Sequence, residues 1–235
     1  MDLDMFGSWA NRFGFGQYAP LDLPRSDQVT GLIPDSSYYD RVFPGGWGPG
    51  YTVNLGIGQG NMGASPLQLA RYTAAIANGG TLPTPHLVRA QTDPATGLVP
   101  EPSLRRARDL SLAPRNLAVI QAGMTDVVEG AGTARRARIA AVGDFPKIPV
   151  AGKTGTSQNP RGKDHSVFIA YAPADDPQVA VGVIVENAGY GGTAAAPIAS
   201  LMIEQYFRGQ TFRPDLVRFV RAQRSTGRIC SGNGE

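Results

Sequence analysis

The most regular hydrophobic pattern of the chain lies after Pro146, where short apolar runs alternate with turn-forming segments. Three runs, at residues 148–158, 165–173 and 178–188, are rich in β-branched and aromatic residues, and this composition predicts β-strands. The segments between them read NPRGKD and ADDP, which is typical of turns. Connections this short join neighbouring strands that run in opposite directions, so the pattern predicts an antiparallel meander.

The third run is apolar on both faces. Alternate residues of a strand point to opposite sides, which places four valines on one face and Ala180, Gly182 and Ile184 on the other. We therefore expect helices to cover both sides of the sheet. Segment 193–207, TAAAPIASLMIEQYF, follows a glycine loop and is the expected helix over the face with the small residues, where a helix can approach closely.

Helical spacing appears earlier in the chain. Ser65 can cap a helix, Pro66 suits the first helical turn and Gln68 completes a capping box, while Asn78-Gly79-Gly80 predicts the end of that helix. A second helix is predicted to start near Pro114 and to end at Gly130. Its apolar stripe predicts core contacts for Leu117, Ile120, Met124, Val127 and Val128.

The two ends of the chain lack such a pattern. Residues 1–60 are rich in Gly, Pro, Asp and aromatic residues without sustained periodicity, and predict extended loops with short helices. Residues 212–235 form a basic, polar tail that we expect to fray. The domain prediction is therefore one globular portion at 1–211 followed by this tail.

Composition places the chain among globular proteins: it has 235 residues, of which 42% are hydrophobic and 17% charged. The net charge is +3, and the densest basic cluster, Arg105, Arg106 and Arg108, has no aromatic residues between its members. That pattern favours a solvated surface over a nucleic-acid groove. The single cysteine, Cys230, cannot form an intramolecular disulfide, and the sequence shows neither a bilayer-spanning run nor a signal peptide.

Two glycine-containing motifs suggest a nucleotide site, and both fail. Gly152-Lys153-Thr154 resembles the end of a P-loop, but Lys147 stands where the first glycine is required and Pro149 removes a backbone donor. The segment 58–63 matches Gly-x-Gly-x-x-Gly, yet the region about 20 residues further on offers no acidic residue for a ribose.

A carboxylate is the better partner for Lys153. In a regular strand Lys153 and Gly155 point to one face, and Thr154 and Thr156 to the other; at an edge or bulge their polar groups can still converge. Gly155, which has no Cβ, lets a peptide backbone lie against the strand. The ammonium group suits a carboxylate and can share protons with a serine nucleophile. The alternative is an exposed strand lysine between β-favouring threonines.

The surrounding segments support the first interpretation. NRFGFGQYAPLDLPRSDQVTGLIP, GIGQGNMGASPLQLARYTAAIANGG, VAGKTGTSQ and DHSVFIAYAPADDPQVAVGVIVENAGYGGTAAAPIA occur in one order. Together they resemble the transpeptidase domain of class B penicillin-binding proteins, and most closely the penicillin-binding protein 2 group, over residues 3–207. The resemblance implies an α/β (α+β) fold with an antiparallel sheet sandwiched between helices, incomplete here at its N-terminal side.

The same resemblance implies acyl transfer from a stem peptide ending in D-Ala-D-Ala during peptidoglycan synthesis, without a cofactor or metal. Lys153 would support proton transfer and attract the substrate carboxylate, the hydroxyl groups of Thr154 and Thr156 would hold it, and the Thr156 N–H would form half of an oxyanion hole. The implied location is the periplasmic side of the inner membrane, with β-lactams as ligands and a membrane glycosyltransferase as partner. The membrane anchor is not found in this sequence.

The family's nucleophile motif is also not found: no serine of the chain has lysine three positions later. A Ser-x-Asn tripeptide, Ser231-Gly232-Asn233, lies in the tail, where chance explains it better. We therefore expect a piece of a transpeptidase domain that is inactive alone. The alternative is a catalytically dead module of the same fold that binds peptide carboxylates or proteins.

Overall fold

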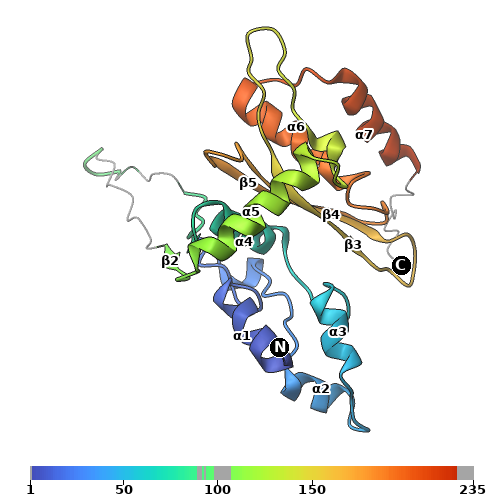
Figure 1. Cartoon of the computed structure of the whole chain (residues 1–235). Helices are drawn as coiled ribbons and strands as arrows, with labels where there is room; N and C mark the ends of the chain where they lie inside the picture. Colours follow the sequence, from blue (N-terminus) through green and yellow to red (C-terminus); the bar gives the residue numbers. More distant parts are fainter. Residues whose placement is uncertain (1, 89–91, 93, 98–106, 227–235) are drawn as a thin grey trace, which may run out of the picture. The chain divides into compact units, whose positions relative to one another are not determined.

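The structure is a computed structural model that describes residues 2–88, 92, 94–97 and 107–226. It comprises two compact units, residues 1–113 and 114–235 (Figure 1). The predictions about Arg105, Arg106, Cys230 and residues 231–233 concern positions outside the described residues. No helix among the described residues has the length and hydropathy needed to cross a bilayer.

Short helices joined by loops make up most of the first unit, as the sequence predicted. Its elements are α1 (Leu3–Arg12), the 3-10 helix η1 (Arg25–Asp27), α2 (Ser36–Val42), α3 (Gly50–Gly56), α4 (Pro66–Ala77), β1 (Thr81–Leu82) and β2 (Arg108–Asp109). β1 and β2 pair in an antiparallel ribbon. Arg108, the described member of the basic cluster, is exposed and donates to the Arg12 backbone oxygen at the end of α1.

An aromatic cluster holds α1, α2 and α3 together. Tyr39 is completely buried, and the rings of Phe43, Trp47 and Tyr51 lie 5.9, 5.5 and 4.8 Å from its own. Burial raises the pKa of the Tyr39 hydroxyl. Aromatic contacts of this kind stabilise a fold beyond the burial of apolar area alone. Helices as short as these are not stable in isolation, so the packing of their side chains stabilises them.

The predicted capping box at the start of α4 is present. The Gln68 N–H donates to the Ser65 hydroxyl oxygen at 3.2 Å, and the Ser65 N–H donates to the Gln68 amide oxygen at 2.9 Å. The buried Gln68 amide nitrogen also donates to the backbone oxygens of Gly14, Gln17 and Thr30. One side chain therefore caps the helix and attaches the N-terminal segment to it.

A three-stranded sheet forms the centre of the second unit. Its elements are α5 (Pro114–Glu129), the 3-10 helix η2 (Arg135–Ala137), β3 (Ala151–Ser157), β4 (His165–Ala172), β5 (Val179–Val185), α6 (Ala195–Arg208) and α7 (Pro214–Thr226). The strand order is β3-β4-β5 and both pairings are antiparallel, which confirms the predicted meander. The predicted fold class, a mixed α/β structure with an antiparallel sheet packed against helices, is also confirmed.

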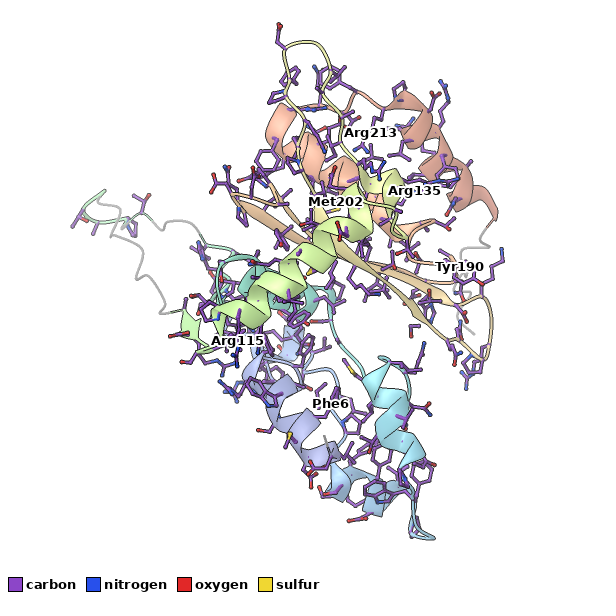
Figure 2. The ribbon with its side chains drawn as sticks, viewed as in Figure 1. Phe6, Arg115, Arg135, Tyr190, Met202 and Arg213 are labelled. Atoms are coloured by element: carbon purple, nitrogen blue, oxygen red, sulfur yellow. The ribbon has the colours of Figure 1, made fainter. Side chains whose placement is uncertain are left out.

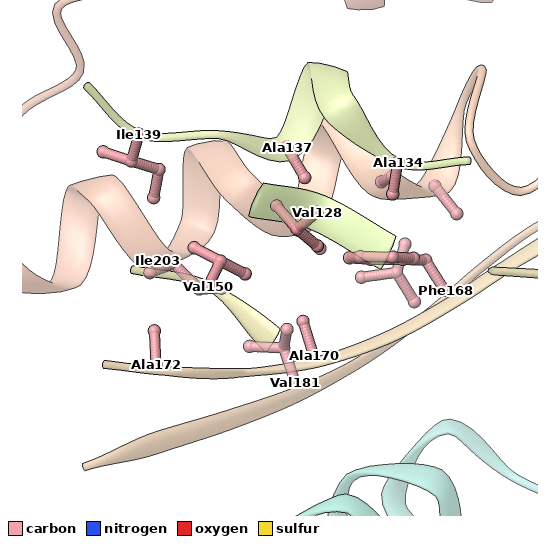
Figure 3. Packing of buried hydrophobic residues seen from close by; sticks show 14 of the residues in the cluster. Val128, Ala134, Ala137, Ile139, Val150, Phe168, Ala170, Ala172, Val181 and Ile203 are labelled. Carbon is pink, nitrogen blue, oxygen red and sulfur yellow. The ribbon is translucent and has the colours of Figure 1, made fainter. Parts of the chain in front are cut away.

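The core of this unit lies on the valine face of β5. Val181 and Val183 pack in one buried cluster with Ala195, Ala199 and Ile203 of α6. Figure 3 shows this cluster between the sheet, α6 and the segment after α5. The prediction that α6 covers the face with Ala180, Gly182 and Ile184 is therefore wrong. The small residues that permit close approach lie on the helix, and the strand contributes the larger side chains.

Two further predictions need correction. Leu117, Met124 and Val128 of the α5 stripe are buried and Val127 packs against the core, but Ile120 is 44% exposed. The tail expected at residues 212–235 contains helix α7, which α6 contacts. Its apolar residues recur at helical spacing, and the basic composition of the segment conceals this pattern.

Candidate active site

The predicted Lys-Thr-Gly-Thr segment lies on β3, an edge strand of the three-stranded sheet. The pairing with β4 is continuous, with Lys153 opposite Ile169 and Thr156 opposite Ser166. A regular pleat therefore places Lys153 and Gly155 on one face and Thr154 and Thr156 on the other, as expected. The residue of β4 opposite Thr154 is Phe168, which belongs to the core cluster. The two threonines therefore lie on the face of the sheet that packs against the core.

Lys153 is an exposed cation without a carboxylate partner among the described residues. Its ammonium nitrogen, Nζ, donates to the backbone oxygen of the next residue, Thr154, at 2.7 Å. This bond bends the side chain along the strand and brings its charge to the strand backbone. The ammonium retains two further donors, which an incoming anion can accept.

The Thr154 hydroxyl is held from a different element. Its Oγ1 lies 2.8 Å from the Oγ1 of Thr133, in the segment between α5 and η2. A hydroxyl group can donate and accept at once, so this contact leaves the pair able to offer one proton to a ligand. Sequence reasoning missed Thr133, because a threonine 21 positions away carries no local sign of this contact.

A glycine pair before α6 packs directly on this region. A Cβ on Gly191 would lie 2.2 Å from the backbone oxygen of Val167 and 2.5 Å from that of Gly155. A Cβ on Gly192 would lie 2.2 Å from the backbone oxygen of Thr133. Only residues without a side chain fit at these distances, so the glycine loop noted in the sequence is a close-packing element beside the lysine-threonine segment.

Ser166 connects the sheet to the start of α6. Its buried hydroxyl donates to the backbone oxygen of Tyr190 at 2.9 Å and accepts from the Ala195 N–H at 3.0 Å. Ser166 lies opposite Thr156 in the β-ladder, so the beginning of α6 is fixed next to the predicted site. This residue was also missed, because a lone serine in an apolar strand resembles any other small residue.

A Ser-x-Asn tripeptide that the sequence reasoning overlooked, Ser157-Gln158-Asn159, begins at the last residue of β3 and enters the turn to β4. Asn159 acts there as a turn residue. Its amide nitrogen donates to the side-chain oxygen of Asn187 at 2.7 Å, and its side-chain oxygen accepts from the Arg161 N–H at 3.0 Å. The tripeptide thus ties two loops together at one end of the sheet.

The dinucleotide-like glycine motif lies in a different setting. Segment 58–63 follows helix α3 instead of a strand, and Gly63 pairs through its backbone with Leu32. The dinucleotide fold needs a strand directly before these glycines. The structure therefore agrees with the rejection of this motif as a nucleotide site.

Taken together, β3 and its neighbours offer one cation, a coupled pair of hydroxyl groups and the backbone of an edge strand. Lys153 and the threonines lie on opposite faces of the strand, but each offers donors at its edge, and a peptide carboxylate is the kind of group that accepts from an ammonium or a hydroxyl while its own backbone runs along a strand. Catalysis of acyl transfer needs in addition an activated nucleophile.

Comparison with known proteins gives a consistent result. The family model for the penicillin-binding protein transpeptidase domain matches residues 1–204. The chain is 35% identical over 214 residues to the peptidoglycan D,D-transpeptidase MrdA of Acinetobacter baumannii, covering 83% of this chain and 30% of that protein. The chain thus spans about a third of the length of the curated relatives it matches.

Solved structures agree. The crystal structure of Pseudomonas aeruginosa PBP2 in complex with WCK 5153 superposes with a TM-score of 0.72 at 37% identity, covering 87% of this chain and 42% of that one. The complex between PBP2 and MreC from Helicobacter pylori also gives a TM-score of 0.72, at 26% identity, over 89% of this chain and 36% of that one.

Proposed function

This chain belongs to the transpeptidase domain family of penicillin-binding proteins, and from that premise we propose that residues 1–211 are part of a peptidoglycan D,D-transpeptidase. In this proposal β3 holds the carboxylate end of a stem peptide that terminates in D-Ala-D-Ala. The observation that carries it is the arrangement at β3. Lys153 has no carboxylate partner among the described residues, and the adjacent residue of the same edge strand, Thr154, holds its hydroxyl against that of Thr133.

Each residue of the segment has a proposed role in binding or in catalysis. Lys153 attracts the terminal carboxylate and lowers the energy of proton transfer near the nucleophile. Thr154 and Thr156 donate hydroxyl hydrogen bonds to the carboxylate, and Gly155 leaves room for the peptide backbone along the strand. The Thr156 N–H points to the carbonyl oxygen that becomes negative in the transition state.

The proposed reaction is acyl transfer in two steps. A serine oxygen bonds to the carbonyl carbon of the penultimate D-alanine, and the peptide C–N bond breaks as the terminal D-alanine leaves with a proton. The amino group of a neighbouring stem peptide then bonds to the same carbon, and the serine oxygen leaves with a proton. A β-lactam would enter by the first step alone, since its carbonyl group and carboxylate can occupy the same contacts.

We propose that the nucleophilic serine lies outside residues 1–235, because these residues contain no Ser-x-x-Lys motif. We propose accordingly that the isolated chain does not form an acyl-enzyme. The same absence favours the second candidate function, a catalytically dead module that binds peptide carboxylates or proteins. The two proposals share the β3 site and differ in whether this site can support acylation once a nucleophile is present.

The proposed location is the periplasmic side of the bacterial inner membrane, which is where stem peptides are cross-linked. A membrane glycosyltransferase is the proposed partner of the whole protein, because polymerisation of the glycan must supply the strands that a transpeptidase joins. Both proposals depend on family membership.

A chimera tests the site directly. In the Acinetobacter baumannii MrdA protein, the region that aligns with this chain is exchanged for the corresponding residues of this chain, and acylation by a fluorescent penicillin is timed. We expect acylation by the chimera, and a roughly 100- to 1000-fold slower reaction after Lys153→Ala, the loss typical of removing one electrostatic contact to the transition state. Lys163→Ala, an exposed lysine in the next turn, is the matched control.

Thermal melting of each chimera separates loss of folding from loss of chemistry. Parent-like acylation by Lys153→Ala would refute the assigned role of this lysine. A folded chimera that does not acylate would refute the transpeptidase proposal in favour of the dead module. Incubating residues 1–235 with excess penicillin should give no covalent adduct by mass spectrometry; a stoichiometric adduct would overturn the placement of the nucleophile.

A further inference from the structure

A pocket of about 480 Å³ lies beside α7 in the second unit, and none of its lining residues belongs to β3. We call it the arginine pocket, because three arginines meet there with an apolar wall: Arg136, Arg138, Arg213, Phe212, Leu216 and Phe219. It is a depression that is open to solvent rather than an enclosed cavity. Figure 2 marks Arg213 between α6 and α7.

Two of the arginines are fixed in place. Arg213 donates from Nε to a carboxylate oxygen of Glu204 at 2.8 Å, and its other nitrogens donate to the backbone and hydroxyl oxygens of Ser200. Arg138 donates to the backbone oxygens of Val128 and Glu129 at 2.7 and 2.8 Å, where α5 ends. A ligand that meets these guanidinium groups needs to immobilise neither, which lowers the entropy cost of binding.

The charges around the pocket do not cancel. Glu204 is buried and already faces two guanidinium groups, those of Arg208 and Arg213. Asp215 is the one acidic residue that lines the pocket, and it forms an ion pair with Arg218. The described residues contain no carboxylate that pairs with Arg136 or Arg138. The pocket therefore carries excess positive charge that a bound anion can neutralise.

Arg136 is the adjustable member of the set. It is exposed, and its guanidinium carbon lies 4.7 Å from the centre of the Phe219 ring. This cation–π contact holds the charge over the apolar wall and leaves the edge donors of the guanidinium group for a planar anion. A carboxylate that is attached to an apolar group would meet the arginines and the phenylalanines at the same time.

The shape of α7 argues against a membrane as the partner. Helices that bind at a bilayer surface present protruding apolar side chains. The large apolar side chains that are exposed in the described residues include none from α7, and its Leu216, Val217, Phe219 and Val220 are half-buried. Leu216 and Phe219 instead line an open surface depression together with charged side chains, a mixture that suits a protein side chain better than lipid chains.

From this arrangement we propose that the arginine pocket docks an acidic, apolar segment of a partner protein, with a carboxylate on the arginines and an apolar side chain against Phe212 and Phe219. The partner is defined by charge complementarity with the pocket. This proposal does not depend on the transpeptidase function, because the pocket uses different residues from those of β3.

Fluorescence anisotropy of residues 1–235 with a capped, labelled pentapeptide of alternating Leu and Glu tests the proposal at about 0.15 M salt. We expect micromolar binding, which becomes about tenfold weaker or more after Arg136→Gln, since one charge-assisted contact is lost. Arg115→Gln, an exposed position on α5, changes the net charge equally and should leave binding unchanged. The same peptide with Gln in place of Glu should not bind.

Circular dichroism of each variant checks that the fold is retained. Arg136 makes a cation–π contact with Phe219 but no side-chain hydrogen bond among the described residues, so Arg136→Gln should leave the fold intact. Equal weakening by both arginine variants would overturn the proposal, because binding would then follow net charge alone. Absence of peptide binding at millimolar concentration would overturn it as well. So would a preference for vesicles of phosphatidylcholine and phosphatidylglycerol that Arg136→Gln abolishes, since the partner would then be a lipid surface.

Discussion

Replacing Glu204 by glutamine should strongly destabilise the second unit. The Glu204 side chain is 1% exposed, and its two oxygens lie 2.8 Å from nitrogens of Arg208 and Arg213. The Arg208 side chain is itself 2% exposed and donates to the backbone oxygens of Ala140 and Pro146 at 2.8 and 2.7 Å. Glu204→Gln keeps the shape of the side chain, but it leaves the Arg208 charge buried without a counter-charge.

Breaking a buried ion pair in this way costs about 3–5 kcal/mol, which is a large part of the roughly 5–15 kcal/mol that holds a typical domain together. At about 2–4 °C per kcal/mol for a chain of this size, the melting temperature should fall by roughly 6–20 °C.

Urea unfolding followed by circular dichroism measures the effect, and Asp215→Asn is the matched control. Asp215 and Arg218 form an ion pair on the surface, with 87% and 75% of their side chains exposed, so this change should cost at most about 1 kcal/mol. A Glu204→Gln protein that unfolds within 1 kcal/mol of the parent would refute the reasoning. That result would mean that water or rearranged carbonyl groups stabilise the two guanidinium groups as well as the carboxylate does.

Three other predictions concern stability. Gln68→Leu should cost about 1–3 kcal/mol in urea unfolding, because it leaves buried backbone oxygens without a donor; an unchanged midpoint would contradict this. Gly191→Ala should lower the melting temperature, because the added Cβ would lie 2.2 Å from a backbone oxygen of β4. Gly123→Ala, which adds a Cβ in open space on α5, should instead raise stability by about 0.5–1 kcal/mol. A Gly191→Ala protein that melts at a higher temperature than Gly123→Ala would refute this account of the packing. Hydrogen bonds from the Tyr38 N–H and, to a smaller extent, from the Ser37 hydroxyl hold the pKa of the Asp35 carboxyl below its ordinary value. The ionised Asp35 carboxylate caps α2, so its contribution to stability is complete at pH values above the ordinary carboxyl pKa and is lost as the pH falls through the lowered pKa of the folded protein. Asp35→Ala should therefore lower the free energy of unfolding at pH 7. The difference between this variant and the parent should shrink as the solution is titrated to acid.

Local patterns in the sequence determined the secondary structure around the site. The three strands after Pro146 and their antiparallel order follow from alternating apolar residues and from turns too short for any other connection. The start of α4 follows from Ser65 and Gln68, which lie three positions apart and satisfy each other's backbone groups. The Lys153–Thr156 segment was placed on a strand by the same reasoning, since every contact involved is between near neighbours.

The tertiary structure decided what lies against these elements. Both faces of β5 are apolar, so the strand pattern could not show which one α6 covers; the alanines of the helix favour the valine face, where small and large side chains interlock. Thr133 reaches Thr154 because α5 ends beside β3, and no spacing along the chain encodes that approach. Helix α7 was hidden in a basic composition, because its half-buried apolar side chains become evident only when the helix is folded. The sequence by itself thus determined the strand that offers the lysine, whereas long-range packing determined which hydroxyl group, loop and helix accompany it, because contacts between distant residues leave no periodic trace in either segment.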